Sequence, residues 1–300
     1  MMYNTSIFVF CVDIIARSKG WAAASQGALA AYHHVRKFYD TVGSLLIQDG
    51  SYLMRPCTRA DTATADVKSN LAPTGTLRVA INYGNAVLAT RDAAGELHGV
   101  SVDIAHELGK RLDLPLTLIP FDAAGKVSDA ASDDIWDVAF LARDPERARR
   151  ITFTAAYVVI DGNYVVPRDS SIMTVEQVDR DGVRVAVSKR SAYDLFLTRA
   201  LKHAQLIHGG STTEAVALFR SDRLEVIAGV KQALDQVVAN DIGLRMIAQP
   251  FMVINQAMGT PSGRPMAAAY LAAFVEDLKA NGFVAQVLKK NGQEEATVAG

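Results

Sequence analysis

The 300-residue sequence contains little cysteine, few aromatic residues and almost no net charge. Its two cysteines, Cys11 and Cys57, are too few for a disulfide framework or, alone, for a thiolate metal site. A formal net charge of -1 offers no basic surface, so we expect no nucleic-acid partner and no binding to an anionic membrane. Half of the residues are hydrophobic and 21% are charged, which is typical of a globular chain with about two domains.

Long apolar runs are also missing, since none reaches the roughly 18 residues that a membrane-spanning helix needs. Residues 6–15 have the length of a signal-peptide core, and residues 22–24 offer a cleavage site, but no Lys or Arg precedes residue 6, where a basic segment should stand. We therefore predict that residues 1–70 are an N-terminal extension or a poor signal region, with Met54 as an alternative start. Residues 58–70 are polar and typical of a linker. Export and a cytoplasmic location both stay open.

From Gly75 onward, short apolar runs alternate with helical periodicity. Strands are predicted over 77–81, 116–119, 136–141, 157–166, 183–187 and 225–228, and helices over 99–112, 191–203, 213–219, 231–239 and 266–288, the last interrupted at 281–282. This alternation predicts an α/β fold with parallel strands. Ligands of such sheets bind beyond the carboxyl ends of the strands, so the loops after Ile81, Leu141, Val187 and Ala228 are candidate binding loops.

Most signatures of catalysis are missing from the sequence. It contains no G-x-S-x-G, no phosphate-binding P-loop and no G-x-G-x-x-G. The six histidines are scattered without a cysteine or carboxylate at ligand spacing, so we predict no metal site and no cofactor. The pair Asp133 and Asp134 has the simpler interpretation of a solvated loop before a strand.

One segment combines a buried strand, a turn and a cluster of arginines. Residues 137–142 lead into Asp144, Pro145 and Glu146, which predict the start of a helix with Asp144 as its cap. Arginines follow at 147, 149 and 150. A guanidinium in such a loop can bind a carboxylate through two parallel hydrogen bonds. Arg149 and Arg150 are expected to be solvated.

Six weak motifs in order resemble one known family. They are residues 75–79, 95–105, 144–147, 151–154, 175–187 and 278–283. Together the motifs are similar to bacterial solute-binding protein family 3, the polar amino-acid-binding proteins of ABC importers, over about residues 71–293. The resemblance implies a periplasmic-binding-protein-like type II fold. Lobe one would comprise 71–160 and 250–300, lobe two would comprise 161–249, and crossing segments would lie near 159–163 and 247–250.

The resemblance also implies a ligand site between the lobes. In this family the arginine at the position of Arg147 clamps the ligand α-carboxylate, and the hydroxyl at the position of Ser191 binds beside a helix N-terminus. The loop after the first strand would line the other side. The full set of expected ligand-binding residues is Arg147, Asn82, Tyr83, Asn85, Phe140, Ser191, Arg190, Lys231 and Gln232.

Two departures from the family pattern bear on the ligand. Arg190 stands where the family usually has glycine, and Val230 to Gln232 lack the aspartate that neutralises a ligand ammonium. A buried ammonium without a carboxylate costs several kcal/mol. Cationic side chains at Lys189, Arg190 and Lys231 instead favour an anion without an amine, such as an organic acid.

Three classes of function follow. The resemblance implies a monomeric, periplasmic binding protein that captures a small carboxylate-bearing solute by hinge closure and delivers it to an ABC permease. The alternative is an enzyme of the cyclohexadienyl dehydratase type on the same scaffold, with Asp161 or Glu214 as general acid. The third is a sensor domain with residues 1–70 as an effector arm.

Overall fold

The computed structural model describes residues 46–48, 51–53 and 63–300, and the chain divides into two compact units, 1–59 and 60–300. In the first unit, β1 (Leu46–Gln48) and β2 (Ser51–Leu53) pair antiparallel. Cys11, Cys57, the apolar run at 6–15 and the alternative start at Met54 lie outside the described residues. Within the described ranges, no helix is long and apolar enough to cross a bilayer.

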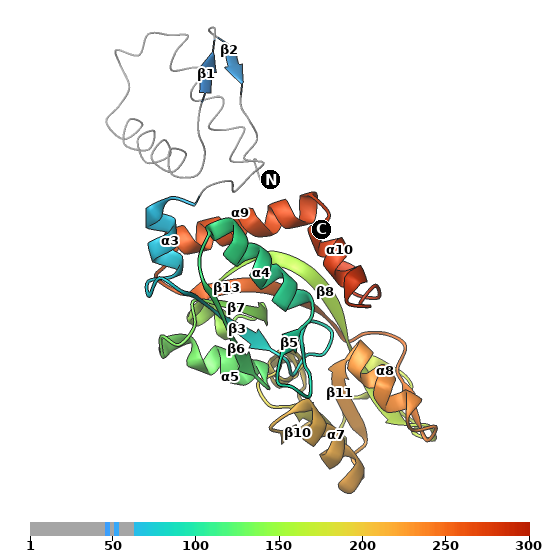
Figure 1. Ribbon diagram of the computed structural model, residues 1–300. Helices are drawn as coiled ribbons and strands as arrows, with labels where there is room; N and C mark the ends of the chain where they lie inside the picture. The colour runs from blue at the N-terminus through green and yellow to red at the C-terminus, as the bar shows by residue number, and fades with distance from the viewer. Residues whose placement is uncertain (1–45, 49–50, 54–62) are drawn as a thin grey trace, which may run out of the picture. The chain divides into compact units, whose positions relative to one another are not determined.

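The second unit contains two sets of parallel strands (Figure 1), which confirms the predicted α/β alternation. The first set, which defines lobe one, is β3 (Leu77–Asn82), β6 (Leu116–Phe121) and β7 (Val138–Ala142), with helices α3 (Ala65–Leu71), α4 (Val100–Leu112), α5 (Ala124–Asp129), α9 (Pro265–Ala280) and α10 (Phe283–Lys290). The small hairpin of β4 (Thr90–Arg91) and β5 (Leu97–His98) belongs here too.

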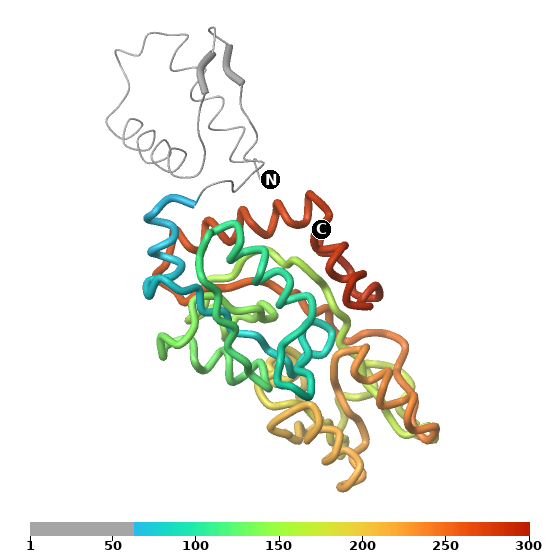
Figure 2. The backbone as a smooth tube through the Cα atoms, viewed as in Figure 1, coloured from blue at the N-terminus to red at the C-terminus, as the bar shows by residue number. Residues whose placement is uncertain are grey.

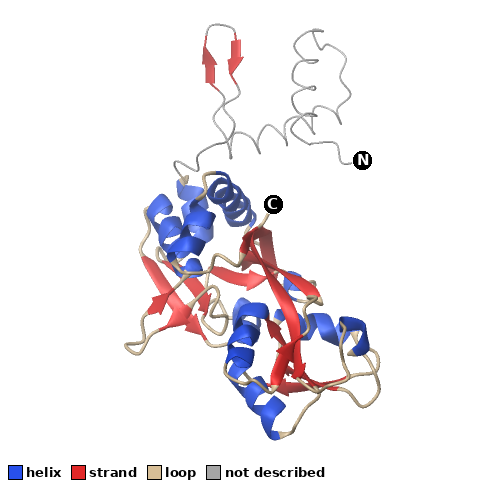
Figure 3. Cartoon of the chain, turned by 90° about the vertical axis from the view of Figure 1, so that its right-hand side faces the viewer, coloured by secondary structure: helices blue, strands red, loops and turns tan. Residues whose placement is uncertain are grey.

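The second set, which defines lobe two, is β9 (Arg184–Ser188), β10 (Gln205–Gly209) and β11 (Val226–Val230). The short β12 (Leu244–Met246) also lies in this lobe and pairs antiparallel with β8. Its helices are α6 (Ala192–Ala200), α7 (Thr212–Ser221) and α8 (Lys231–Ala239). Helices lie on both sides of these strands in Figure 3, as the alternation of short strands and amphipathic helices requires. Each lobe has apolar side chains packed about its own strands.

Two long strands, β8 (Ile151–Pro167) and β13 (Met252–Pro261), run through both lobes and join them. They pair antiparallel, with Met252 opposite Gly162 and Gln256 opposite Val158. A last strand, β14 (Thr297–Val298), pairs with β8 at Val158 and Val159. The strand order is β10-β9-β11-β8-β13-β7-β3-β6, so the described lobes share one continuous sheet. The exact lobe boundaries given above stay predictions.

The expected linker over 58–70 is wrong for its described C-terminal part, because α3 begins at Ala65. The Thr64 side chain caps this helix by accepting the Val67 N–H, and Val67 and Leu71 are buried four residues apart on one face. α3 packs against α9, and the Asn70 side chain accepts the Ala267 N–H at 2.9 Å. Figure 2 shows this meeting of the blue N-terminal helix with the red C-terminal segment.

Candidate functional site

The predicted helix start at Asp144 is instead a single 3-10 turn, Arg147–Arg149, because strand β8 begins at Ile151. Asp144 does not cap this turn as predicted, because the residue before the turn is Glu146 and no side chain caps it. Asp144 instead holds the chain just ahead of the turn. Its Oδ1 accepts the Glu146 N–H at 2.8 Å, and its carbonyl accepts the Ala148 N–H at 2.9 Å. Arg149 is exposed beside Glu146 and Arg150 is exposed, as expected. This turn directs Arg147 inward.

The Arg147 side chain is buried, with 3% of its residue surface exposed. Nη1 donates to the Ala142 carbonyl at 2.9 Å and Nη2 donates to the Arg190 carbonyl at 2.8 Å. Among the described residues, Nε has no hydrogen-bond partner and no carboxylate forms an ion pair with this guanidinium. Burial lowers the pKa of Arg147 to about 10, the nearby Asp144 charge opposes that effect, and the Arg190 charge adds to it.

The loop between β9 and α6 supplies Arg190 and Ser191. Arg190 has a left-handed backbone, with φ at 58°, so the arginine here takes a conformation that favours glycine. The Asp194 carboxylate holds this turn by accepting the Arg190 N–H at 2.6 Å. Ser191 caps α6, because its Oγ accepts the Asp194 N–H at 3.0 Å. The spacing Ser-x-x-Asp could have revealed the Ser191 cap from sequence.

Three polar contacts connect the turn after β7 and helix α5, both in lobe one, with lobe two. The first is the bond from Arg147 to the Arg190 carbonyl. In the second, Arg190 Nη2 lies 3.0 Å from Asp129 Oδ1. In the third, Arg199 Nη2 lies 2.6 Å from Asp144 Oδ2, and Nη1 lies 3.3 Å from Oδ1. The loops at the carboxyl ends of β7 and β9 therefore meet, as the topology of α/β sheets favours.

The loop after β3 lies at the same edge of lobe one. The Asn82 side chain accepts the Gly84 N–H at 3.1 Å, and the Asn85 carbonyl accepts the Leu88 and Ala89 N–H groups. Tyr83 packs against the lobe-one core with the Arg91 guanidinium 5.9 Å from its ring centroid. Gly84 approaches β6 so closely that a Cβ would lie 2.1 Å from the Asp122 carbonyl oxygen. Among the described residues, no hydrogen bond or ion pair joins this loop to the Arg147 side chain.

The remaining expected residues are placed differently. Phe140 is a core residue of lobe one, 5.8 Å edge-on from Tyr157, and does not lie beside Arg190. Lys231 begins α8, where Nζ lies 2.8 Å from Asp235 and 3.6 Å from Glu295, and the hydrogen bond to Asp235 raises its pKa. Gln232 Oε1 is buried without a hydrogen-bond partner among the described residues.

Sequence reasoning missed the carboxylates around the arginines. Asp129 and Asp144 reach their partners in lobe two over 61 and 55 residues of sequence, and no local pattern signals such pairs. Asp194 also binds His208, whose Nε2 lies 2.8 Å from Oδ1. In the described part of the chain, no group of three or more His, Cys, Asp and Glu side chains is placed to hold a metal ion.

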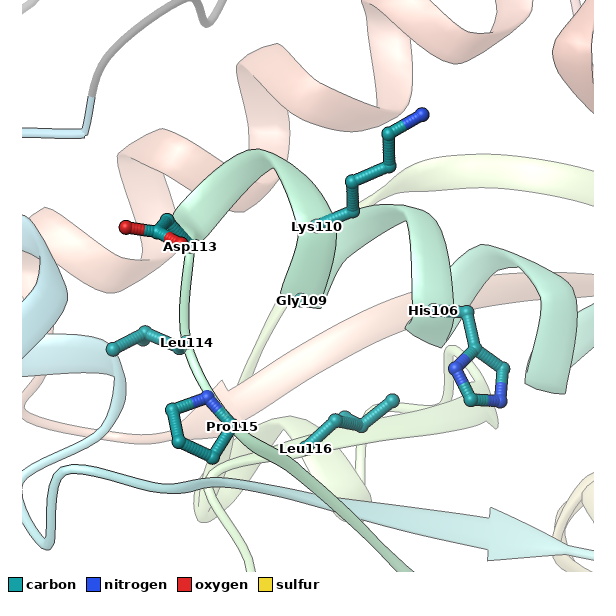
Figure 4. A pocket seen from close by; sticks show the side chains of 7 residues that line it. All are labelled: His106, Gly109, Lys110, Asp113, Leu114, Pro115 and Leu116. Carbon is teal, nitrogen blue, oxygen red and sulfur yellow. The ribbon is translucent and has the colours of Figure 1, made fainter.

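Two surface pockets lie elsewhere, along α4. The larger, of about 540 Å³, is lined by His106, Gly109, Lys110, Asp113, Leu114, Pro115 and Leu116. Figure 4 shows Lys110 extending away from the proline and the two leucines. The other lies between α4 and α10 and shares His106 and Lys110. None of the expected ligand-binding residues lines either pocket, so we place the candidate site at Arg147 instead.

We compared the sequence and the fold with those of known proteins. A cyclohexadienyl dehydratase of Pseudomonas aeruginosa is 29% identical over 145 residues, which is 46% of this chain. That alignment spans only 53% of the dehydratase, about half of its length.

Solved structures match more of the chain. A mutant of ArgBP from T. maritima has a TM-score of 0.65 at 18% identity and covers 76% of this chain and 100% of its own. The solute receptor for L-cysteine of Neisseria gonorrhoeae gives 0.65 at 18%, covering 74% and 92%. An ancestral amino acid-binding protein, a precursor of cyclohexadienyl dehydratase, gives 0.62 at 18%, covering 74% and 97%.

At such low identity these structures show the fold alone, and they confirm the two-lobed, type II periplasmic-binding-protein architecture expected from the sequence. The family suggested by the order of the six motifs is likewise confirmed, since a sequence model of that family matches most of the second unit. The chain belongs to the bacterial extracellular solute-binding proteins, family 3, whose model matches residues 77–294.

Proposed function

We propose that this chain is the substrate-binding component of an ABC importer, acting in the periplasm as a monomer. It captures a small carboxylate-bearing solute between its lobes by hinge closure and presents the closed form to a permease. The family membership supports solute binding, and family 3 is described as extracellular. In this proposal Arg147 is the anchor for the carboxylate, with Arg190 and Ser191 on the facing lobe.

The burial of Arg147 carries the proposal. A guanidinium has five N–H donors, and here two of the nitrogens donate to backbone carbonyls while Nε has no partner among the described residues. Burying a cation without a paired anion costs several kcal/mol. A ligand carboxylate at this position supplies both the missing charge and the missing acceptor. Charge-assisted bonds of this kind contribute about 1.5–3 kcal/mol each.

The chemistry near the anchor supports an organic acid better than an α-amino acid. No aspartate stands among residues 229–232, at the start of α8, to receive an ammonium. Arg190 places a second cation close to Arg147, and Asp129 is paired with it at 3.0 Å. Lys231 contributes less to this argument than its charge suggested, because Asp235 and Glu295 already engage its ammonium. Tyr83, Asn82, Asn85, Phe140 and Gln232 stay proposed lining residues.

The test is a thermal-shift screen followed by calorimetry on the full chain, comparing mono- and dicarboxylates with the common α-amino acids. A solute at about a hundred times its Kd stabilises the folded state by about 2.7 kcal/mol, which raises Tm by roughly 5–10 °C. We expect that rise with at least one carboxylate that lacks an amine. Stronger shifts with standard amino acids would contradict the organic-acid proposal.

The variant Arg147→Met tests whether this side chain is needed for ligand binding rather than for folding. Methionine removes the charge and keeps much of the volume, so we expect the unliganded Tm to change little while the carboxylate-induced shift is lost. Arg149→Met is the matched control, because Arg149 lies in the same turn but is exposed and pairs only with the neighbouring Glu146. An undiminished shift in Arg147→Met would remove this residue from the site.

A second candidate function is a dehydratase activity, which the partial match to cyclohexadienyl dehydratase favours. That chemistry needs a general acid within hydrogen-bond reach of the leaving hydroxyl. Glu214 is exposed and accepts the Gly210 N–H at 2.7 Å, and Asp161 lies on β8 opposite Val253. Neither residue contacts Arg147 in the described structure. Incubation with prephenate or arogenate, followed by ultraviolet detection of an aromatic product, tests this activity.

A further inference from the structure

The carboxylate of Asp144 organises the turn that carries Arg147. Its Oδ1 accepts the Glu146 N–H, and its carbonyl accepts the Ala148 N–H, so the residues on both sides of Arg147 are held by Asp144. The Asp144 charge also favours the cationic form of Arg147. Only 5% of the Asp144 side chain is exposed. The position of the Arg147 guanidinium therefore depends on how Asp144 is held.

The Asp144 carboxylate is gripped from the other lobe by Arg199 of α6. Nη2 lies 2.6 Å from Oδ2 and Nη1 lies 3.3 Å from Oδ1, the two-pronged geometry in which an arginine binds a carboxylate most specifically. We call this contact the closing ion pair. Asp144 follows β7 in lobe one, whereas the neighbours of Arg199 on α6, Tyr193 and Leu197, are buried in the core of lobe two.

Arg199 is too far along its helix to be part of the anchor itself. It lies eight residues beyond Ser191, which is about 12 Å along the helix axis. The N-terminal end of α6 faces Arg147 through Arg190, and the C-terminal end reaches Asp144. One helix of lobe two thus contacts the Arg147 turn at two separated points.

We infer that Arg199 is a positioning residue that favours the closed arrangement and, through Asp144, sets the Arg147 turn. The role assigned to Arg147 rests on the proposed function, whereas the closing ion pair does not. When the lobes part, α6 moves away from the turn after β7, and the pair must break. Its free energy therefore counts only toward the closed state and shifts the population between closed and open forms.

The experiment measures the distance between the lobes in the full chain. Cys11 and Cys57 are replaced by serine, and spin labels are attached at Asp133→Cys and Thr213→Cys, which are exposed positions in lobe one and lobe two. Arg199→Gln removes the charge and shortens the side chain, while keeping a polar amide at its end. We expect it to lower the ratio of short to long distances about fivefold, with the Tm within a few degrees of the parent.

Two further variants test whether the change in distance comes from loss of the closing ion pair. Arg199→Lys keeps the charge and should restore part of the short-distance population. Arg220→Gln is the matched control, since Arg220 pairs with Asp241 at 3.9 Å inside lobe two and should leave the distances unchanged. Raising the salt to about 1 M should shift the parent toward long distances more than Arg199→Gln, because salt screens an ion pair that the variant lacks.

Unchanged distances in Arg199→Gln, or an equal shift in Arg220→Gln, would overturn the inference. Failure of Arg199→Lys to recover any short-distance population would also overturn it. The readout needs no solute, so the two proposals fail separately. A shift in Arg199→Gln with no carboxylate bound in the solute screen would leave the closing ion pair standing and would remove the carboxylate proposal.

Discussion

At the scale of a residue, Asp137 shows how arginine partners stabilise one buried carboxylate. Its carboxylate lies at the amino end of β7, fully buried, and accepts hydrogen bonds from Arg78 and from Arg264 at 2.7–2.9 Å. Burial raises the pKa of this carboxyl, but the bonds from the two arginines outweigh burial, and the net pKa is lowered. Asp134 joins the same cluster as a partner of both arginines. The acidic pair at 133–134 is thus partly structural.

A lowered pKa in the folded state has a definite consequence for stability against pH. Asp137 contributes stability above its unfolded pKa of 3.8, and that stability is lost as pH falls through the lower folded value. Asp137→Asn should therefore cost about 3 kcal/mol at neutral pH and flatten the loss of stability below about pH 4. Urea denaturation at several pH values measures both effects. Parallel pH curves for the variant and the parent would contradict the role assigned to the carboxylate.

The candidate site shows how far single residues could be predicted. The choice of Arg147 over Arg149 and Arg150 rests on the family resemblance, because a place in the same turn does not by itself distinguish one guanidinium from another. The acceptors of Arg147, the carbonyls of Ala142 and Arg190, carry no side-chain signal and could not be predicted. Phe140 stays a predicted ligand-binding residue, and in the structure it is buried edge-on to Tyr157.

At the scale of elements, α3 extends the folded unit upstream of the strand that opens the family match. Leu71 is fully buried and belongs to the lobe-one core with Leu278 and Ala267. We expect Leu71→Ala to reduce the free energy of unfolding by about 2–5 kcal/mol, measured by urea denaturation. Ser69→Ala on the exposed face of the same helix is the control and should change it by less than about 0.5 kcal/mol. Equal small effects would mean that α3 contributes little to the core.

The elements that the sequence predicts and those that it misses differ in which side chains they bury. Helix α8 was predicted with its observed bounds, because its apolar residues recur at helical spacing. β13 was missed because it buries polar side chains, Gln256 and Thr260, which break the alternation that marks a strand. β10 was missed for the opposite reason, since as an edge strand it is mostly part-exposed and has a weak apolar signal.

At the scale of the whole molecule, a glycine in α5 controls how closely the lobes approach. A Cβ on Gly125 would lie 2.7 Å from Arg190 Cβ in the other lobe, which requires the two segments to separate. Gly125→Ala should therefore increase the radius of gyration measured by small-angle scattering. Gly109→Ala is the matched control, because its Cβ would lie 3.5 Å from Leu116 Cβ, an ordinary contact inside lobe one.

The same two variants distinguish an effect on the distance between the lobes from an effect on helix stability. Alanine in place of a helical glycine gains about 0.5–1 kcal/mol where there is room, so Gly109→Ala should raise Tm slightly and keep the parent's radius of gyration. An unchanged radius in Gly125→Ala would mean that the loop at Arg190 yields without moving the lobes.

The pairing of β8 has a mechanical consequence. At Val158 and Val159 this strand has neighbours on both sides, β13 and β14, and from Gly162 onward it pairs with β11. Only at Ile160 and Asp161 does the connection thin to a ribbon of two strands. The hinge motion that we propose would twist this short ribbon, so the torsional stiffness of the ribbon would limit the angle to which the lobes open.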